Sequence, residues 1–378
     1  MRRHWDIFCT VIDNFGDIGV CWRLSRQLTH EYGQLVRLWV DNLHRLSCLE
    51  PAINDELQCQ VIQGIEVWHW QKNSEVFEQI EPAEVVIEAF ACELPGNYLR
   101  KMLQRNIQTV WINLEYLSAE PWVKSYHAMP SPHPRSGLIK TCFFPGFEPD
   151  TGGLIREKDY ELQRVNCNKQ AILQQLEIPF DRYDAIRISL FCYDSAPIES
   201  LIELLSELGT PILLIVPQGK VAQRIIALFG YFRYEVKMYL QFQQLTVLVI
   251  PFLEQRGYDR LLWSCDINFV RGEDSFVRAQ YAAKPFIWNI YQQAEQVHWQ
   301  KLDAFLDLYT VSMPLQMKDT VQELWHSWNG RGSMNRNALL KFISLAEPLE
   351  QYNRAWFEQL AKQNDLASNL VQFVENRL

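Results

Sequence analysis

Short apolar runs alternate with longer amphipathic stretches along most of this chain. In the first half, runs rich in Val, Ile and aromatic residues predict strands at 6–12, 35–40, 84–90, 109–114 and 140–147. The stretches between them, such as 20–32 and 97–106, repeat apolar residues every three or four positions and predict helices. Because strands that alternate with helices form βαβ units, the pattern predicts an α/β fold around a parallel sheet.

The same alternation starts again near Asp184. Further strands are predicted at 185–193, 211–217, 245–252, 267–272 and 285–290. Two stretches rich in Pro, Gly and charge, 130–137 and 145–159, lie between the halves, and the pattern is helical from about Ser312 onward. The sequence therefore predicts two open α/β domains, residues 1–155 and 156–378. The terminal helices either complete the second domain or pack back on the first.

The composition narrows the classes of partner. Hydrophobic residues make up 48% of the 378 residues and charged ones 21%, which is typical of a globular chain and argues against disorder. The 36 Lys and Arg residues against 45 Asp and Glu give a net charge of -9. This charge disfavours a nucleic-acid partner or an anionic membrane surface, and it suits a cationic partner better.

The N-terminal stretch and the cysteines indicate the compartment. The first 13 residues lack the continuous apolar stretch of a signal peptide, and no apolar run approaches the roughly 20 residues of a membrane span, so we expect a cytoplasmic protein. The nine cysteines form no C-x-x-C pair. We therefore expect reduced thiols, with Cys9, Cys21 and Cys192 as small core residues, and neither a metal site nor a cofactor.

The first candidate site is the acidic loop "VIDNFGDIG", which follows the first predicted strand. It carries Asp13 and Asp17 four residues apart, with Gly16 and Gly19 beside them. The G-x-G-x-x-G fingerprint is absent, and two carboxylates would repel a phosphate, so the loop suits a cation or proton transfer. A purely structural interpretation, in which Asp13 caps a turn and Asp17 caps the next helix, fits the spacing equally well.

The second candidate site is "FVRGEDSFVRAQYA", where an apolar strand leads into the start of a helix. Asp274 or Ser275 at the helix start leaves backbone N–H groups for an anion, and Arg271 can add a charge-assisted contact. A diphosphate fits such a site. A capped helix with a surface ion pair is the structural alternative.

Aromatic and amide side chains at other strand ends could join this second site. Phe191 and Tyr193 end one predicted strand, and Phe252 and Gln255 follow another, so the rings could stack on a nucleobase. Taken singly, such aromatic residues are more often part of the core. A first-half strand likewise ends in polar and aromatic residues that would face the same crevice, namely Asn113, Glu115 and Tyr116.

Together, "DNFGDIGVCWRL" and "RGEDSFVRAQ" resemble the bacterial protein-arginine rhamnosyltransferases that modify elongation factor P. "INLEYLSAE" and "PFLEQRGYDRLLW" occur in the family's order, so the resemblance spans nearly the whole chain. It implies a GT-B glycosyltransferase with two facing Rossmann-like domains and a cleft, in which 1–155 bind the acceptor and 156–378 bind the donor. The implied reaction moves L-rhamnose from dTDP-β-L-rhamnose to an arginine of elongation factor P, with inversion and without a metal.

The resemblance also implies roles for the acidic residues. Asp17 would be the general base, Asp13 would hold the acceptor arginine, and Glu273 would lie near the sugar and the leaving group. This agrees with elementary chemistry, because a guanidinium keeps its proton to above roughly pH 12 and needs a carboxylate to orient it and accept a proton.

On the donor side, the resemblance implies that Phe252 stacks on thymine and that Tyr193 and Ser275 hold the diphosphate. The full set of implied donor-binding residues is Phe191, Tyr193, Phe252, Gln255, Arg271, Asp274 and Ser275.

Two other functions fit parts of the sequence. A glycosyltransferase acting on a small molecule or a glycan would keep the donor site, but it would not need two acidic residues placed for a guanidinium. A non-catalytic regulator could bind a nucleotide sugar and a translation factor without turnover.

Overall fold

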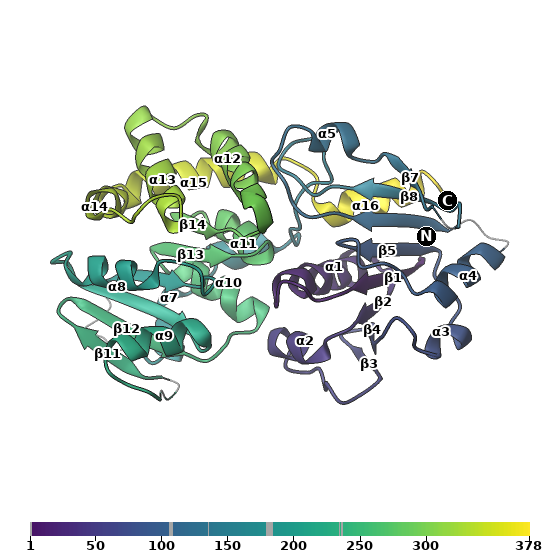
Figure 1. Cartoon of the computed structure of the whole chain (residues 1–378), viewed down its shortest axis with the longest axis horizontal. Coiled ribbons are helices and arrows are strands. Elements are labelled where there is room, and N and C mark those ends of the chain that lie inside the picture. Colours follow the sequence, from purple (N-terminus) through teal and green to yellow (C-terminus); the bar gives the residue numbers. More distant parts are fainter. Residues whose placement is uncertain (1, 106–108, 135, 179–183, 234, 236) are drawn as a thin grey trace. The chain divides into compact units, whose positions relative to one another are not determined.

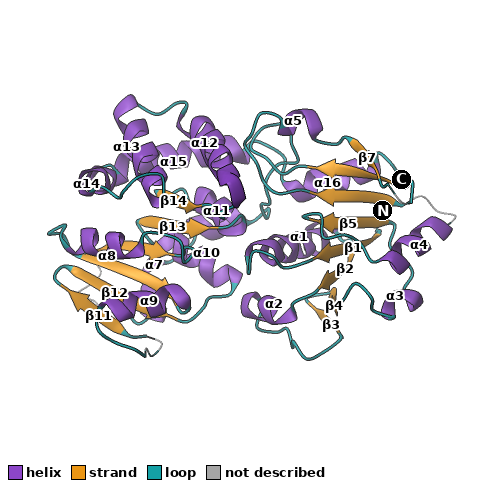
Figure 2. Ribbon diagram, in the orientation of Figure 1, coloured by secondary structure: helices purple, strands orange, loops and turns teal. Residues whose placement is uncertain are grey.

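The computed structural model describes residues 2–105, 109–134, 136–178, 184–233, 235 and 237–378. The chain forms two compact units, Met1–Tyr160 with Ala361–Leu378, and Glu161–Leu360. Each unit contains one sheet with helices packed on it (Figures 1 and 2). The domain boundary at residue 155 stays a prediction.

The first unit is built on an eight-stranded sheet in which β3 and β7 are antiparallel to their neighbours and the other pairs are parallel. In spatial order the strands are β3 (Cys59–Ile62), β4 (Ile65–His69), β2 (Leu35–Val40), β1 (His4–Cys9), β5 (Val85–Ala89), β6 (Val110–Leu114), β8 (Ile139–Phe143) and β7 (Pro130–Pro132). Its helices are α1 (Gly16–Tyr32), α2 (Leu43–Leu49), α3 (Val76–Gln79), α4 (Gly96–Gln104), α5 (Val123–Tyr126) and α16 (Leu366–Glu375).

Helices cover both faces of this sheet. On one face, Phe8 and Trp111 of the sheet pack with Phe77 of α3 and Tyr98 of α4 in a buried aromatic cluster. Successive strand residues point to opposite faces, so Cys9 points to the other face, where its thiol contacts Cys21 of α1. The central strands are buried on both faces, as their nearly continuous apolar runs require.

The second unit is built on a six-stranded sheet in which only β11, among the described strands, is antiparallel to its neighbour. The order is β11 (Tyr239–Phe242), β12 (Leu245–Ile250), β10 (Ile212–Pro217), β9 (Ile186–Leu190), β13 (Ile267–Arg271) and β14 (Phe286–Asn289). Its helical segments are α6 (Tyr160–Val165), α7 (Lys169–Gln175), α8 (Ile198–Ser206), α9 (Lys220–Leu228), α10 (Gln255–Ser264), α11 (Asp274–Tyr281), the 3-10 turn η2 (Ala294–Gln296), α12 (Val297–Thr310), α13 (Leu315–Trp328), α14 (Arg336–Ser344) and α15 (Ala346–Ala361).

Helices α11 and α12, which come before and after β14 in the chain, pack on this strand through aromatic residues. Phe276 of α11 stacks on Trp288 with ring centroids 3.9 Å apart, and Phe305 of α12 contacts Phe276 at 4.6 Å. Large flat rings bury much apolar area, so these contacts hold α11 and α12 firmly to the β14 edge of the sheet.

The α/β class and every strand predicted from an apolar run are confirmed, with ends that differ by a few residues. The last residue of the helix predicted at 97–106 lies outside the described part of the chain. In the described ranges, no helix is both long and apolar enough to cross a membrane.

Candidate functional site

The carboxylate of Asp17 lies at the start of α1 and is held by the loop before it. Its Oδ2 accepts the backbone N–H of Ile12 at 2.7 Å and of Asp13 at 2.8 Å, and the residue is only 2% exposed. The N-cap residue of α1 is Phe15, which makes no capping hydrogen bond through its side chain. Asp17 therefore binds the preceding loop, which differs from the helix cap of the structural interpretation.

Burial raises the pKa of Asp17, because a charged carboxylate loses hydration. The N–H groups of Asp13 and Ile12 and a hydrogen bond with the Tyr116 side chain act in the opposite direction, and the charge of Asp41 raises the pKa further. The net effect is that the pKa of Asp17 is raised, while its position is fixed by hydrogen bonds. Both are properties of a general base.

Asp13 lies directly over the turn that leads into α1. Its carbonyl accepts the N–H of Gly16 at 2.6 Å, and a Cβ on residue 16 would lie 2.7 Å from Asp13 Oδ2. Asn14 has the positive φ of 36° that this tight turn requires. The loop therefore holds both predicted acidic residues, since the Asp13 N–H donates to the Asp17 carboxylate, and glycine at position 16 makes room for the Asp13 side chain.

Residues at neighbouring strand ends support this loop. Asp41, directly after β2, accepts the N–H of Val11 at 2.9 Å. Phe90, directly after β5, stacks on Tyr116 with centroids 4.5 Å apart. Sequence reasoning named Tyr116 among the crevice residues and missed Asp41 and Phe90. The sequence feature that could have identified both is that each directly follows a parallel strand, and ligands of such sheets bind at the carboxyl ends of the strands.

In the second unit, the predicted donor-binding residues lie at or shortly after the carboxyl ends of three strands, β9, β12 and β13. Phe191 and Phe252 make an edge-to-face contact with centroids 6.4 Å apart, and Phe191 also contacts Tyr258 at 5.6 Å. The two predicted rings therefore share one small aromatic cluster at the carboxyl end of the sheet. Tyr258, within α10, was missed because helical periodicity alone marks it as a packing residue.

Arg271 lies against this aromatic cluster. Its guanidinium carbon is 4.3 Å from the Phe191 ring centroid and 4.9 Å from that of Tyr193, and Nη1 donates to the Cys192 carbonyl at 3.1 Å. The planar cation is held by two rings and a carbonyl, which keeps its charge at the edge of the sheet.

The start of α11 carries the remaining acidic and hydroxyl residues. Glu273 is the N-cap residue and makes no capping hydrogen bond through its side chain, and Asp274 is in the first turn. Ser275 Oγ accepts the N–H of Arg271 at 3.2 Å and donates to the same residue's carbonyl. Ser275 is 6% exposed, so in this structure its hydroxyl fixes the Arg271 loop.

Contacts between α10 and α11 hold these residues in register. Gln255 Nε2 donates to Asp274 Oδ2 at 3.3 Å. Beneath them, Arg278 forms two hydrogen bonds with the Asp259 carboxylate, at 2.7 and 3.0 Å, and both side chains are buried. The ion pair therefore joins the two helices that carry predicted donor-binding residues.

Tyr193 is positioned by residues that sequence reasoning missed. Its N–H donates to Asn289 Oδ1 at 2.9 Å, and its ring meets Tyr291 edge-to-face at 5.5 Å. Asn289 ends β14, so its signal was again a polar residue at the carboxyl end of a parallel strand.

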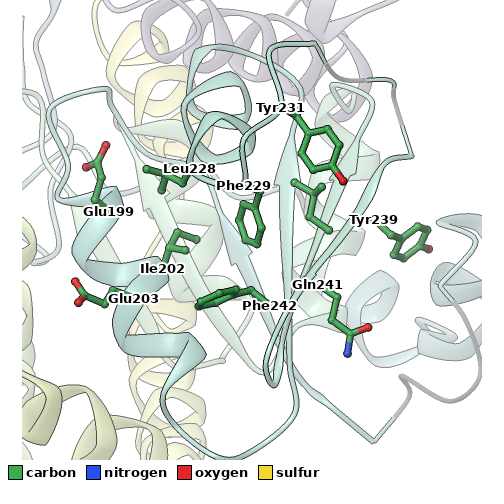
Figure 3. A pocket seen from close by; sticks show the side chains of 10 residues that line it. Glu199, Ile202, Glu203, Leu228, Phe229, Tyr231, Tyr239, Gln241 and Phe242 are labelled. Atoms are coloured by element: carbon green, nitrogen blue, oxygen red, sulfur yellow. The ribbon is translucent and has the colours of Figure 1, made fainter.

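A separate pocket of about 670 Å³ lies in the second unit between α8, the end of α9 and β11 (Figure 3). None of the predicted donor-binding residues lines it. Phe229 and Phe242 meet edge-to-face inside it at 6.1 Å, while the carboxylates of Glu199 and Glu203 turn away from these rings.

Known proteins are similar to the chain over its whole length. The model of the family described as elongation factor P (EF-P) rhamnosyltransferase EarP matches residues 5–375. A protein-arginine rhamnosyltransferase of Pseudomonas putida is 42% identical over 383 residues, covering 100% of both chains. The protein of the same name from Pseudomonas aeruginosa is 40% identical, covering 98% of each chain.

Solved structures that resemble this chain are also glycosyltransferases. A structure described as the basis for EarP-mediated arginine glycosylation of translation elongation factor EF-P matches with a TM-score of 0.69 at 31% identity, covering 100% of both chains. A glycosyltransferase of Rickettsia africae matches with a TM-score of 0.55 at 11% identity, covering 99% of this chain and 97% of that one. These likenesses confirm the predicted fold class.

Proposed function

The chain belongs to the elongation factor P rhamnosyltransferase (EarP) family, and from this premise we propose its full reaction. An L-rhamnosyl group passes from dTDP-β-L-rhamnose to a guanidino nitrogen of one arginine of elongation factor P. The configuration at the anomeric carbon inverts, because one displacement takes place without a covalent sugar–enzyme intermediate.

The observation that carries the proposal is the buried carboxylate of Asp17. Two backbone N–H groups fix it, its pKa is raised, and Asp13, four residues earlier in the same loop, provides one of those N–H groups. A guanidinium is a poor nucleophile while protonated, and its planar N–H groups match carboxylate oxygens. Asp13 orients the guanidinium, and Asp17 takes the proton from the attacking nitrogen.

The second unit supplies the donor half of the reaction. Phe252 offers a ring face for the thymine base and packs against Phe191. Tyr193 binds the diphosphate, and Ser275 contributes by holding the Arg271 loop through its hydroxyl. The cation of Arg271 and the N–H groups at the start of α11 stabilise the charge that grows on the leaving group. Because these groups supply positive charge, we propose that transfer needs no metal ion or other cofactor.

The bonds change in one step. A proton moves from the guanidinium to Asp17 as the nitrogen lone pair forms a bond to the anomeric carbon. The bond from that carbon to the diphosphate oxygen breaks, and its electron pair leaves with dTDP. The glycosylated guanidinium keeps a single positive charge, and Glu273 lies beside the sugar and the leaving group.

Intact-mass analysis of elongation factor P tests the proposal. After incubation with the chain, dTDP-β-L-rhamnose and excess EDTA, the factor should gain the mass of one rhamnosyl residue, which fragmentation places on one arginine. Replacing that arginine by lysine in the factor should abolish the gain. Recovery of activity only on adding Mg²⁺ would contradict the metal-free proposal.

The same experiment separates the alternatives. Release of dTDP with the sugar on a small molecule or a glycan, and an unchanged factor, would indicate another acceptor. Binding of dTDP-rhamnose and of the factor without turnover would indicate a regulator.

A further inference from the structure

We infer that Tyr116 is a positioning residue for Asp17, and that Phe90 acts through Tyr116. The hydroxyl of Tyr116 holds the Asp17 carboxylate ready to accept a proton, while the ring of Phe90 holds Tyr116 in place. This inference rests on the proposed function, in which Asp17 is the base.

The contact between the two rings is the first observation. Tyr116 lies two residues beyond the end of β6, and Phe90 lies directly after β5, the neighbouring parallel strand. Their rings stack with centroids 4.5 Å apart and an interplanar angle of 19°, and Phe90 is 6% exposed. A buried ring stacked on Tyr116 restricts the directions in which its hydroxyl can point.

The backbone of Phe90 is the second observation. Phe90 and the next residue, Ala91, have φ values of 56° and 53°. Residues with a Cβ rarely adopt this left-handed conformation, and they keep it where the surroundings impose it. Here the N–H of Phe90 donates to the Leu114 carbonyl at 2.7 Å, which ties the turn after β5 to the end of β6. The strained turn is therefore what places the Phe90 ring on Tyr116.

The surroundings of Asp17 show what the hydroxyl does. Three donors serve this carboxylate, namely the N–H groups of Ile12 and Asp13 and the side chain of Tyr116. The titratable groups that interact with it are Tyr116 beyond β6, Asp41 directly after β2 and Cys9 in β1, while Asp13 contacts it through its backbone N–H. Among the described donors, Tyr116 is the side chain whose hydrogen bond opposes the effect of burial on the pKa of Asp17.

The consequence for catalysis follows from these contacts. A hydrogen bond to the ionised carboxylate favours that form, so the hydroxyl keeps Asp17 ionised to a lower pH. Without it, the pKa of Asp17 rises, and transfer requires a higher pH. The carboxylate also loses one restraint on its orientation, so the maximal rate falls.

The test measures transfer to elongation factor P against pH for Tyr116→Phe, which keeps the ring stack and removes only the hydroxyl. We expect the acid limb of the pH profile of kcat/KM to move to higher pH. The plateau kcat should fall by about 10-fold, which is less than the ~10²-fold effect of removing a base. Asp41→Asn should move the same limb to lower pH, because it removes a neighbouring negative charge.

A double variant tests the part played by Phe90. Phe90→Leu alone should move the limb in the same direction as Tyr116→Phe. Adding Phe90→Leu to Tyr116→Phe should move it no further, since Phe90 acts only through the hydroxyl. Tyr126→Phe, an exposed tyrosine in the same unit, is the matched control and should leave the profile unchanged.

A Tyr116→Phe enzyme with the wild-type limb would overturn the inference, as would additive shifts in the double variant. A lower plateau kcat with an unchanged acid limb would indicate that Tyr116 only packs in the site, and this result would also overturn the inference. If the wild-type chain transfers no rhamnose to the factor at any pH, the proposed function fails instead, so the two failures are distinguishable.

Discussion

In the proposed reaction, one charged side chain at the carboxyl end of each sheet serves a separate part of the chemistry. In the first unit, the charge of Asp17 is fixed by N–H groups of its own loop, whereas in the second unit the charge of Arg271 is fixed by rings and a carbonyl. In both cases contacts within the protein hold the charged group in place, which would reduce the reorganisation that the proposed reaction requires.

At this scale we expect Phe252→Ala to weaken dTDP binding without affecting the fold. Loss of base stacking on a side chain costs ~1 to 3 kcal/mol, so calorimetry should show a dissociation constant raised between about 5- and 150-fold. Phe242→Ala, a half-exposed phenylalanine of the pocket in Figure 3, is the matched control and should bind dTDP normally. Equal affinity in both variants would remove Phe252 from the donor site.

Elements were predictable where their signal is local. Most parallel strands were recognised as apolar runs, because helices cover both of their faces and most of their side chains are buried. The antiparallel strands β3, β7 and β11, and the parallel β4, were missed. Each is short and at least partly exposed, so its sequence lacks a continuous apolar run. Tyr258 and Asn289 were missed for another reason, since their contacts depend on how α10 and β14 pack against the donor loops.

At the scale of elements, we predict that the contact between α10 and α11 stabilises the second unit and supports the donor-binding residues. Removing one partner of the buried Arg278–Asp259 pair leaves an uncompensated charge, which costs about 3 to 5 kcal/mol. Asp259→Asn should therefore lower the urea midpoint strongly, and it should also weaken dTDP binding because Gln255 and Asp274 lose their register.

The exposed pair of Lys72 and Glu93 provides the control, with both side chains at least 60% exposed. Glu93→Gln should change stability by at most about 1 kcal/mol. A double variant, Arg278→Met with Asp259→Leu, should recover much of the lost stability, because two apolar groups replace the ion pair. An Asp259→Asn urea midpoint equal to that of Glu93→Gln would contradict the assigned role.

At the scale of the whole molecule, each unit carries one half of the proposed chemistry. The predicted acceptor and base residues belong to the unit that contains Met1–Tyr160, and the predicted donor residues belong to Glu161–Leu360. Damage to the base should therefore leave donor binding intact, and damage to the donor site should leave the acidic loop intact.

The most direct measurement of the central claim is the transfer rate of Asp17→Asn beside its dTDP affinity. Asparagine keeps the size of Asp17 and can still accept the N–H groups of Ile12 and Asp13, but it cannot take a proton. The account predicts a rate on elongation factor P that falls by at least ~10²-fold, with unchanged dTDP affinity and an unchanged thermal midpoint. A folded Asp17→Asn enzyme that rhamnosylates the factor at close to the wild-type rate would contradict it.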